Sequence, residues 1–401
     1  QSFYNYIIHS IYDDDEDTFF DGIYQVKPGF YLKFKLNNNF QYEEIKWREI
    51  KFKKNQNIDY AESKNLVRSL FLKNIDLHLR SDVLVGAALS GGLDSSAIVC
   101  SMRYLNPKMP INTFTYVDED QNLNESKWAD LVNKHVNAIP HKVKISRGQI
   151  IDDLEDFVCS QCEPFGSTSA YAQYCLFKKA REVGIKVTLD GQGGDEIFGG
   201  YDGYVGYRLL SLLEEIKFID AIKFLHYWSK YPNRNLTIGL MDLGRLILPD
   251  YFYKFARRSL GSNFKPKWLN SSKLDCYQVK YFEKRDVFLD KFKNKRLIEK
   301  LSNSLTSKGL PNMLRIADRN SMNFSIESRM PFLTNELVEL AHNLPEHYLV
   351  NKRGLTKNIF RDSMIGIVPN EILFRKDKIG FQTSQNLWIF NNIKFFREEV
   401  L

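Results

Sequence analysis

Apolar residues recur along this chain in two patterns, and the first predicts alternating strands and helices. Four short apolar runs have the length of buried strands, at residues 83–89, 111–117, 142–145 and 185–189. Helical spacing follows at about residues 125–136, 148–160 and 169–183. Strands that alternate with helices pair in parallel, because parallel neighbours need a crossover connection. We therefore predict an α/β fold whose core, residues 78–204, is a doubly wound parallel sheet.

The second pattern predicts a largely helical insertion over residues 205–310 and a helical C-terminal part over 311–401. Apolar residues of the insertion recur at helical spacing, at Leu209, Leu210, Leu212, Leu213, Ile216, Phe224, Leu225 and Trp228. Prolines should interrupt these helices, at Pro232, Pro249 and Pro266. Residues 1–55 follow neither pattern, since they hold short strand-like pieces such as 29–34 and a polar turn at 37–39.

Composition excludes several classes of protein. Hydrophobic residues make up 43% and charged residues 26% of the 401, which rules out disordered, collagen-like and coiled-coil chains. No run approaches the ~18 apolar residues of a membrane span, and the polar start does not resemble a signal peptide. The five cysteines are an odd, sparse set, which favours a reducing, cytoplasmic compartment. The pair Cys159-x-x-Cys162 is open to a redox or zinc role, but two thiols on a helix is the favoured interpretation.

The net charge of +7 is concentrated in the helical insertion. Residues 205–300 hold 20 Lys plus Arg and 10 Asp plus Glu, a balance of +10, so the other residues sum to −3. A basic helical surface is open to nucleic-acid binding, but lysine-rich outer faces are more often solvated surface. We expect neither a nucleic acid nor a membrane as partner.

The turn after the first predicted strand carries phosphate-binding chemistry. It reads Leu89-Ser90-Gly91-Gly92-Leu93-Asp94-Ser95 and leads into a helix. Its glycines let backbone N–H groups approach an anion, and the helix N-terminus adds its dipole. Asp94 would repel phosphate unless a cation lies between them, so we interpret it as a Mg²⁺ ligand. No Walker-type lysine follows, and a simple helix-capping turn is the alternative.

Further motifs make the chain resemble one enzyme family. They read Glu163-Pro164-Phe165-Gly166-Ser167, Asp190-Gly191-Gln192-Gly193-Gly194-Asp195-Glu196, Arg315-Ile316-Ala317-Asp318-Arg319, Ile326-Glu327-Ser328-Arg329-Met330-Pro331-Phe332 and Arg375-Lys376-Asp377-Lys378-Ile379-Gly380-Phe381. In this order, after the Ser-Gly-Gly turn, they resemble the synthetase domain of glutamine-dependent (class B) asparagine synthetases over roughly residues 60–390. The resemblance implies an adenine nucleotide α-hydrolase-like fold with a pyrophosphate loop.

The resemblance also implies roles for individual residues. ATP would contact Leu89, Ser90, Gly91, Gly92, Leu93, Asp94, Ser95, Tyr116, Asp190 and Gly191. Mg²⁺ would bind Asp94 and Asp195, although Asp195 with Glu196 is also open to a helix-capping acidic pair. Lys378 matches a family lysine over the reacting carboxylate and phosphate, where a cation stabilises developing charge.

The stretch from Arg315 to Arg329 has helical spacing, which places two guanidiniums and a carboxylate on one face. These groups either read a substrate's α-amino and α-carboxylate groups or form a structural ion-pair network. The substrate-binding candidates are Glu163, Arg315, Asp318, Glu327 and Arg329, and the catalytic candidates besides Lys378 are Gln192 and Arg319.

Two residues depart from the family pattern. Gln192 stands where bacterial asparagine synthetases carry Glu, and an amide can hydrogen-bond but cannot act as a base. This departure weakens the prediction that aspartate is the acceptor and leaves the identity of the substrate open. Thr334 replaces the usual Asp after Pro-Phe-Leu, which we interpret as a local capping change.

The activity that the resemblance implies is ATP-dependent amide synthesis. A substrate carboxylate would attack Mg-ATP, release pyrophosphate and form an acyl-AMP, which ammonia would then open. In the family's parent activity the carboxylate is that of aspartate. The ammonia comes from glutamine in the full-length enzyme. The family's glutaminase half begins with a cysteine, whereas residue 1 here is Gln and residues 18–34 resemble that half's closing strands. We therefore expect residues 1–55 to be the remnant of a truncated glutaminase domain and residues 56–401 to be the synthetase domain.

Three alternatives to asparagine formation stand beside it. One is amide synthesis on another carboxylate, by a peptide or ring cyclase or a sugar amidase. For this activity and for asparagine formation alike, the sequence allows a homodimer. The others are a tRNA-modifying enzyme with the same loop, which would lack the Arg315–Phe332 motifs, and a non-enzymatic module, which would be expected to lose loop residues.

Overall fold

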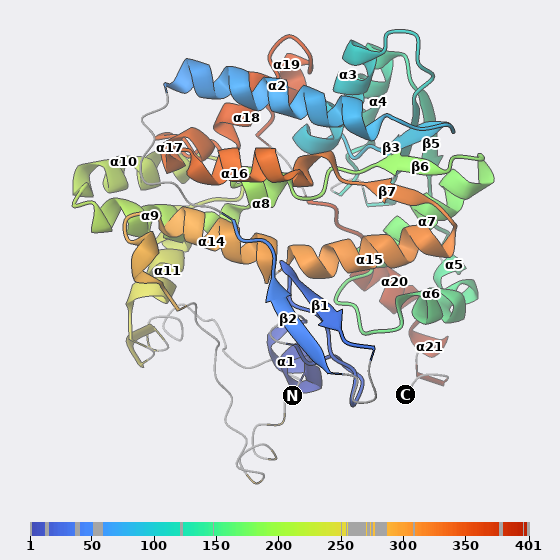
Figure 1. The fold of residues 1–401 in the computed structure, drawn as a ribbon, viewed down its shortest axis with the longest axis horizontal. Helices are drawn as coiled ribbons and strands as arrows, with labels where there is room; N and C mark the ends of the chain where they lie inside the picture. Colours follow the sequence, from blue (N-terminus) through green and yellow to red (C-terminus); the bar gives the residue numbers. More distant parts are fainter. Residues whose placement is uncertain are drawn as a thin grey trace.

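The computed structural model describes most of the chain, namely residues 2–12, 16–36, 41–50, 59–120, 123–146, 148–249, 251–253, 255, 270, 273, 276, 287–307, 309–376, 380–395 and 397–398. Its centre is a five-stranded sheet in which every neighbouring pair is parallel (Figure 1). The strand order is β5 (Ile139–Val143), β4 (Asn112–Tyr116), β3 (Val85–Ala88), β6 (Val187–Leu189) and β7 (Glu327–Arg329).

The four predicted strands are confirmed, although β5 begins three residues before the predicted run. The fifth strand was not predicted, because the segment from Arg315 to Arg329 has helical spacing in the sequence. That expectation is wrong beyond Asn323, where α15 (Leu310–Asn323) ends. Ser325 adopts φ +53°, and the Glu327 amide then donates to the carbonyl of Lys186 at 2.9 Å, which pairs the segment with β6.

The order of the strands creates a crevice between β3 and β6. The chain runs from β3 outward to β5 through α3 (Leu93–Leu105) and α4 (Ser126–Val136), then returns through α5 (Gln149–Asp152), α6 (Leu154–Gln161) and α7 (Ser169–Glu182) to β6. Right-handed crossovers in opposite directions place these two groups of helices on opposite faces of the sheet. Ligands of such sheets bind where the direction reverses, beyond the strands' carboxyl ends.

The insertion after the sheet is helical, as predicted. It contains α9 (Val205–Glu214), α10 (Phe218–Trp228) and α11 (Leu236–Ile247), which lie together at one end of the molecule (Figure 1). Leu209, Leu212 and Phe224 of the predicted apolar stripe are buried, whereas Ile216 is 75% exposed because it follows the end of α9. The predicted break at Pro232 falls in a turn, Pro249 follows the end of α11, and Pro266 lies outside the described residues.

An aromatic cluster joins the C-terminal part to the sheet domain. Phe332 and Phe360 pack against Phe71 of α2 (Tyr60–His78) with ring centroids 4.9 Å and 5.0 Å away, and Phe198 of α8 (Gly194–Phe198) stacks on Phe360. All four rings are buried. The remaining helices of this part are α14 (Arg296–Thr306), α16 (Asn335–Asn343), α17 (Glu346–Leu349), α18 (Asn358–Ser363), α19 (Asn370–Leu373), α20 (Gln385–Asn391) and α21 (Ile393–Phe395).

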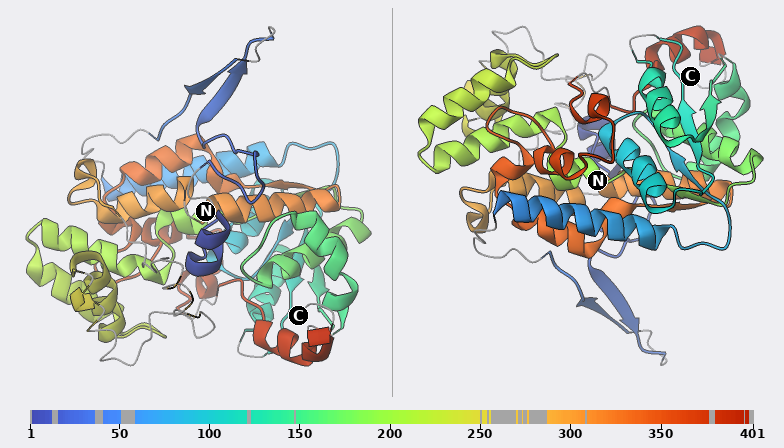
Figure 2. Two further views of the ribbon diagram at one scale, coloured as in Figure 1. Left: turned by 90° about the horizontal axis from the view of Figure 1, so that it is seen from below. Right: turned by 90° about the horizontal axis from the view of Figure 1, so that it is seen from above.

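The N-terminal residues form a helix and a projecting ribbon. Helix α1 (Ser2–His9) is tied to the body by the Tyr6 hydroxyl, which donates to the Phe165 carbonyl at 3.0 Å. Strands β1 (Phe30–Phe34) and β2 (Tyr42–Lys46) pair antiparallel and extend away from the body (Figure 2). Among the described residues, no helix combines the length and hydropathy that a membrane crossing requires.

Burial of His342 makes stability depend on pH. The ring lies in α16, 3% exposed, with Nδ1 3.0 Å from the Val338 carbonyl oxygen, and burial lowers the pKa of His342 to about 4. Because the unfolded chain binds a proton near pH 6.5 and the folded chain does not, stability falls as the pH drops below that value. From pH 7 to pH 5 we expect a loss of about 2 kcal/mol in unfolding free energy. Urea unfolding should show this loss in the wild type and not in His342→Gln; an equal loss in both would contradict it.

Candidate functional site

The turns after β3 and β6 touch each other in the crevice at the centre of the sheet. A Cβ placed on Gly191 would lie 3.2 Å from the Ser95 amide nitrogen, and one on Gly194 would lie 2.8 Å from the Asp94 carboxyl carbon. Only glycine therefore allows the second turn to approach the first this closely. The two glycine-rich motifs form one site, as their positions at strand ends predicted.

The first turn is ordered by its own hydroxyl groups. The Ser90 amide donates to Ser95 Oγ at 3.2 Å, the Gly92 amide donates to Ser90 Oγ at 3.2 Å, and Ser95 Oγ donates to the Gly92 carbonyl at 3.3 Å. Gly91 has φ +76°, and a Cβ there would lie 2.5 Å from Trp128 Cβ. The turn is thus a closed, compact loop at the start of α3, suited to holding phosphate on backbone N–H groups.

Asp94 and Asp195 converge on one buried cation that the sequence analysis did not predict. Lys357 Nζ lies 2.5 Å from Asp94 Oδ2 and 2.6 Å from Asp195 Oδ1, and the lysine side chain is 3% exposed. Lys357 has φ +54° and stands at the start of α18. No motif surrounds it in sequence, so its contribution is visible only in three dimensions.

The convergence shows that the two carboxylates fit a divalent cation. Both carboxylates reach one point, and Mg²⁺ in nucleotide sites is usually bound by one or two carboxylates with phosphate oxygens and water. Within the described part of the chain, no group of three or more His, Cys, Asp or Glu side chains is arranged for a metal. A two-carboxylate site completed by phosphate therefore matches the donor set better than a metal site built from protein alone.

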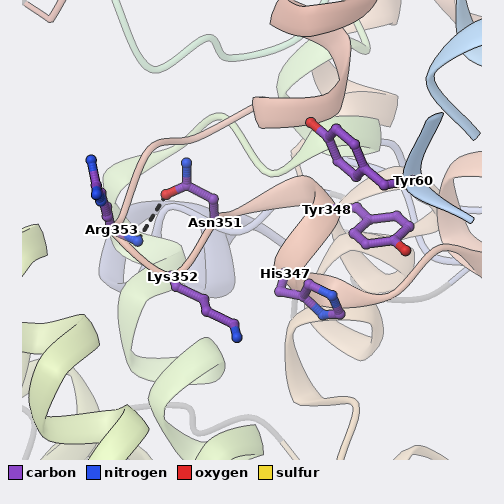
Figure 3. A pocket seen from close by; sticks show the side chains of 6 residues that line it. All are labelled: Tyr60, His347, Tyr348, Asn351, Lys352 and Arg353. Atoms are coloured by element: carbon purple, nitrogen blue, oxygen red, sulfur yellow. Dashed lines mark hydrogen bonds between the residues drawn. The ribbon is translucent and has the colours of Figure 1, made fainter.

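A hydrogen-bonded turn positions Lys357. Asn351 Oδ1 accepts from the amides of Arg353 at 2.9 Å and Leu355 at 3.1 Å, and Asn351 Nδ2 donates to Asn358 Oδ1 at 2.7 Å. Figure 3 shows this turn beside a shallow surface pocket at which Tyr60 and Tyr348 meet. The Tyr60 hydroxyl also donates to Asp362 Oδ2 at 2.6 Å, which ties α18 to α2. The backbone of Lys357 is therefore positioned by the packing of α18, while its ammonium group pairs with the two nucleotide turns.

Two arginines add positive charge beside this centre. Arg361 is 7% exposed, and burial lowers the pKa of its guanidinium while Asp94 and Asp195 oppose that effect. Arg375, from the last motif, donates to the Gly91 carbonyl at 3.2 Å, pairs with Glu125 and lies over the Trp128 ring at 4.9 Å. The first turn is therefore fixed from outside by a residue almost three hundred positions later in the chain.

A cavity of about 720 Å³ extends from this centre. Residues that the sequence analysis assigned to ATP line it, namely Leu89, Ser90, Gly92, Leu93, Asp94, Ser95, Tyr116, Asp190 and Gly191. The Tyr116 hydroxyl donates to Asp118 at 2.7 Å. Burial opposes ionisation of Asp118, but hydrogen bonds from Ser384 and Tyr116 outweigh it and lower its pKa. The site's outer wall near the C-terminus is therefore anchored to the end of β4.

The turn after β6 brings three polar groups into the cavity. Burial raises the pKa of Asp190 to about 6, against hydrogen bonds from Ser328 and the Gly191 amide. Burial also raises the pKa of Glu196, whose carboxylate accepts from the Tyr201 hydroxyl at 2.7 Å. Gln192 lines the cavity, and its Oε1 is buried without a hydrogen-bond partner among the described residues. An acceptor atom in that position suits a ligand that donates a hydrogen bond.

The predicted substrate-binding residues lie elsewhere. Glu163 Oε2 accepts from Arg315 Nε at 3.0 Å and Arg319 Nη1 at 3.2 Å, which forms the ion-pair network that the sequence left open. Arg329 pairs with Glu327 at 2.7 Å and donates to the backbone carbonyls of His78 and Arg80.

The described residues that line the cavity include neither Asp318 nor the five charged residues of these ion pairs, Glu163, Arg315, Arg319, Glu327 and Arg329. Their assignment to substrate or catalysis stays a prediction, and Lys378 lies outside the described residues. The cavity walls instead include residues that no motif had marked, namely Glu125, Tyr231, Arg234, Asn312, Lys357 and Arg361.

Comparison with known proteins agrees with this geometry. The family model described as asparagine synthase matches residues 66–401. Asparagine synthetase [glutamine-hydrolyzing] 1 of Bacillus subtilis is 29% identical over 334 residues, which cover 82% of this chain and 50% of that protein. Asparagine synthetase [glutamine-hydrolyzing] 3 of the same organism is 27% identical over 379 residues, or 89% and 54% of the two chains.

Amidase chry2 of Gibberella zeae is 23% identical over 427 residues, covering 93% of this chain and 60% of the amidase. The chain thus spans about half the length of the curated asparagine synthetases it matches. Because the family model covers most of the chain and includes every loop of the site, the chain belongs to the asparagine synthase family.

Proposed function

We propose that this chain is an ATP-dependent ligase that adenylates a carboxylate and transfers the acyl group to nitrogen. The observation that carries the proposal is the convergence of Asp94 and Asp195, from the turns after β3 and β6, on one cationic point beside the Ser90–Ser95 turn. A phosphate chain on that turn would lie between backbone N–H groups and the two carboxylates. Mg²⁺, when bound to Asp94 and Asp195, would neutralise the phosphate charge and favour pyrophosphate as leaving group.

In the proposed reaction, the substrate carboxylate attacks the α-phosphorus of ATP and the bond to the β-phosphate oxygen breaks. Pyrophosphate leaves beside Lys357 and Arg361, whose positive charges stabilise it. An amine then attacks the carbonyl of the acyl adenylate, and AMP leaves. Ammonia is the amine in the family's parent activity, and glutamine would supply it in a longer protein that carries a glutaminase domain.

Aspartate is the first acceptor to consider, because the similar proteins of Bacillus subtilis are named asparagine synthetases. With aspartate the product would be asparagine, formed by way of β-aspartyl-AMP. A second candidate is amide synthesis on another carboxylate, such as a peptide, a ring precursor or a sugar acid. Two observations favour it: Gln192 replaces an ionisable residue, and Glu163 is already shared by Arg315 and Arg319. The similar Amidase chry2 is in line with this breadth.

Substitution of Asp94 tests the proposed activity. Pyrophosphate release from Mg-ATP should depend on a carboxylate, tried first as aspartate with ammonium and then as a panel of other acids. Asp94→Asn should lower that release about 100-fold, since it removes a group that holds the metal at the leaving phosphates. Asp130→Asn is the matched control and should retain activity, because Asp130 is an exposed residue of α4 that pairs with Lys142 and does not line the described cavity. ATP cleavage to ADP and phosphate, without pyrophosphate, would refute the proposal.

Substitution of Lys357 tests the charge balance at the centre. Lys357→Met leaves two buried carboxylates facing each other, so we expect the metal-free protein to lose about 3 kcal/mol of unfolding free energy. Mg²⁺ should recover part of this loss, because it replaces the missing positive charge. Lys352→Met, at an exposed position of the same turn, should change neither quantity. Equal sensitivity of both variants to Mg²⁺ would show that Lys357 does not balance the aspartates.

Substitution of Gln192 tests whether its amide holds the amine. Loss of one hydrogen bond of about 1.4 kcal/mol corresponds to a tenfold change in affinity. Gln192→Ala should therefore raise the KM for ammonium about tenfold, and the KM for ATP should not change. A rise confined to ATP would instead place Gln192 at the nucleotide.

A further inference from the structure

Two cysteines lie at the C-terminal end of α6, next to Gln161 and Glu163, which contact α15. Cys159 lies in the last turn of the helix and Cys162 is its C-cap, and both side chains are exposed. The Cys162 amide donates to the Val158 carbonyl at 3.1 Å, so the helical turn between the cysteines is intact. Helix geometry then places the two Cα atoms about 5 Å apart, which lies within the range of about 4.4–6.8 Å that disulfides span.

The Cys162 side chain already points back along the helix. Its sulfur donates to the Cys159 carbonyl oxygen at 3.0 Å. Cys162 adopts φ +56°, a left-handed conformation in which a residue with a Cβ costs roughly 1–2 kcal/mol relative to glycine. Glycine or asparagine is usual at such a cap, whereas here a thiol occupies the position and lies over the turn that holds the second thiol.

The other described cysteines differ from this pair. Burial raises the pKa of Cys100 and of Cys175 to about 12, so both remain thiols in a closed core. Cys276 is exposed and far from the pair in sequence, which makes it a natural internal control for oxidation. Reactivity at ordinary pH should therefore be confined to exposed thiols, of which Cys159 and Cys162 alone stand three residues apart.

The residues on either side of Cys162 connect the pair to the cavity. Gln161 Nε2 donates to Asn320 Oδ1 at 2.7 Å, and the Gln161 carbonyl accepts from Arg319. Glu163 binds Arg315 and Arg319. All three partners lie on α15, whose first turns supply Asn312, Met313 and Ile316 to the cavity wall. The nucleotide turns contact none of these groups in the described hydrogen bonds and ion pairs.

We propose that Cys159 and Cys162 form a reversible disulfide whose closure changes the cavity wall that α15 supplies through Asn312, Met313 and Ile316 and leaves the nucleotide turns unaltered. A low-molecular-weight disulfide such as oxidised glutathione is the oxidant. One thiolate attacks a sulfur of the oxidant and displaces one low-molecular-weight thiol, and the second thiolate then displaces the other. The protein loses two hydrogens and the oxidant gains them, so that two thiols leave for each bridge formed.

The bridge acts through the backbone of the cap. To bond Cys159 Sγ, the Cys162 sulfur must leave the Cys159 carbonyl, and we expect the ring that closes across residues 159–162 to shift the backbone of the cap, which lies between Gln161 and Glu163. The contacts of Gln161 and Glu163 with α15 then weaken. That the wall supplied by α15 contacts the substrate carboxylate rests on the proposed function, whereas formation of the bridge does not.

Mass spectrometry of the oxidised chain tests the bridge itself. After incubation with oxidised glutathione, a peptide holding residues 159–162 should lose the mass of two hydrogens and regain it with dithiothreitol. Cys276→Ser should leave this result unchanged, and Cys162→Ser should carry one glutathione on Cys159 instead. Stable mixed disulfides on both Cys159 and Cys162 of the wild type, without a bridge, would overturn the proposal.

Two further measurements test the coupling. Hydrogen exchange should become faster in α15 of the oxidised wild type and remain unchanged in oxidised Cys162→Ser, a readout that needs no activity. With the carboxylate that supports pyrophosphate release, oxidation should raise the KM for that carboxylate about fivefold while the KM for ATP stays constant. Unaltered hydrogen exchange in α15, or a rise in the KM for ATP alone, would overturn the coupling. If no carboxylate supports pyrophosphate release, the proposed function fails. Mass spectrometry and hydrogen exchange would still decide whether the bridge forms and reaches α15.

Discussion

The arrangement of the site depends on electrostatic repulsion between two carboxylates, one buried and one partly buried. Asp94 and Asp195 follow different strands and would repel each other strongly in a crevice shielded from water. Lys357 Nζ lies within 2.6 Å of both and balances that charge. Because the lysine comes from α18, the two nucleotide turns can approach each other only when the C-terminal part is folded against the sheet.

This dependence gives the aromatic cluster a functional consequence. Phe71, Phe198, Phe332 and Phe360 fix α18 against α2 and α8. Arg375 adds a second link, since it holds the Gly91 carbonyl and Glu125 from the far end of the chain. The glycine-rich turns carry the proposed phosphate site, but Lys357 and Arg375, between 162 and 284 positions later, hold them in place. A nucleotide-binding segment isolated from the C-terminal part would therefore keep its motifs and lose its geometry.

The sheet and the nucleotide turns were predictable from the sequence because each depends on local information. Strands β3, β4 and β6 lie in short apolar runs, and the glycines of the two turns follow β3 and β6 directly. The strand at residues 327–329 was not predictable in this way, since its pairing with β6 is non-local and the preceding helical spacing continues through it. The end of α15 is set by the Ser325 torsion and by the sheet edge, which periodicity does not encode.

The same distinction separates the site residues. Asp94 and Asp195 belong to recognisable motifs, and the structure brings them together as expected. Lys357 belongs to none, because a lysine gains this role only when two carboxylates surround it. Glu163 and Arg315 were substrate-binding candidates with a structural ion-pair network as the alternative; the structure shows that ion pair, and their role toward a substrate stays a prediction. Residue type indicates what a group can bind, and only the fold determines which partner reaches it first.

The central claim is that this site activates a carboxylate by adenylation, and isotope exchange tests it most directly. Labelled pyrophosphate should enter ATP in the presence of Mg²⁺ and an acceptor carboxylate without any amine, because the proposed first step is reversible and consumes no amine. The account predicts exchange that requires the carboxylate and disappears in Asp94→Asn. ATP turnover that proceeds without exchange, or exchange that is independent of the carboxylate, would contradict it.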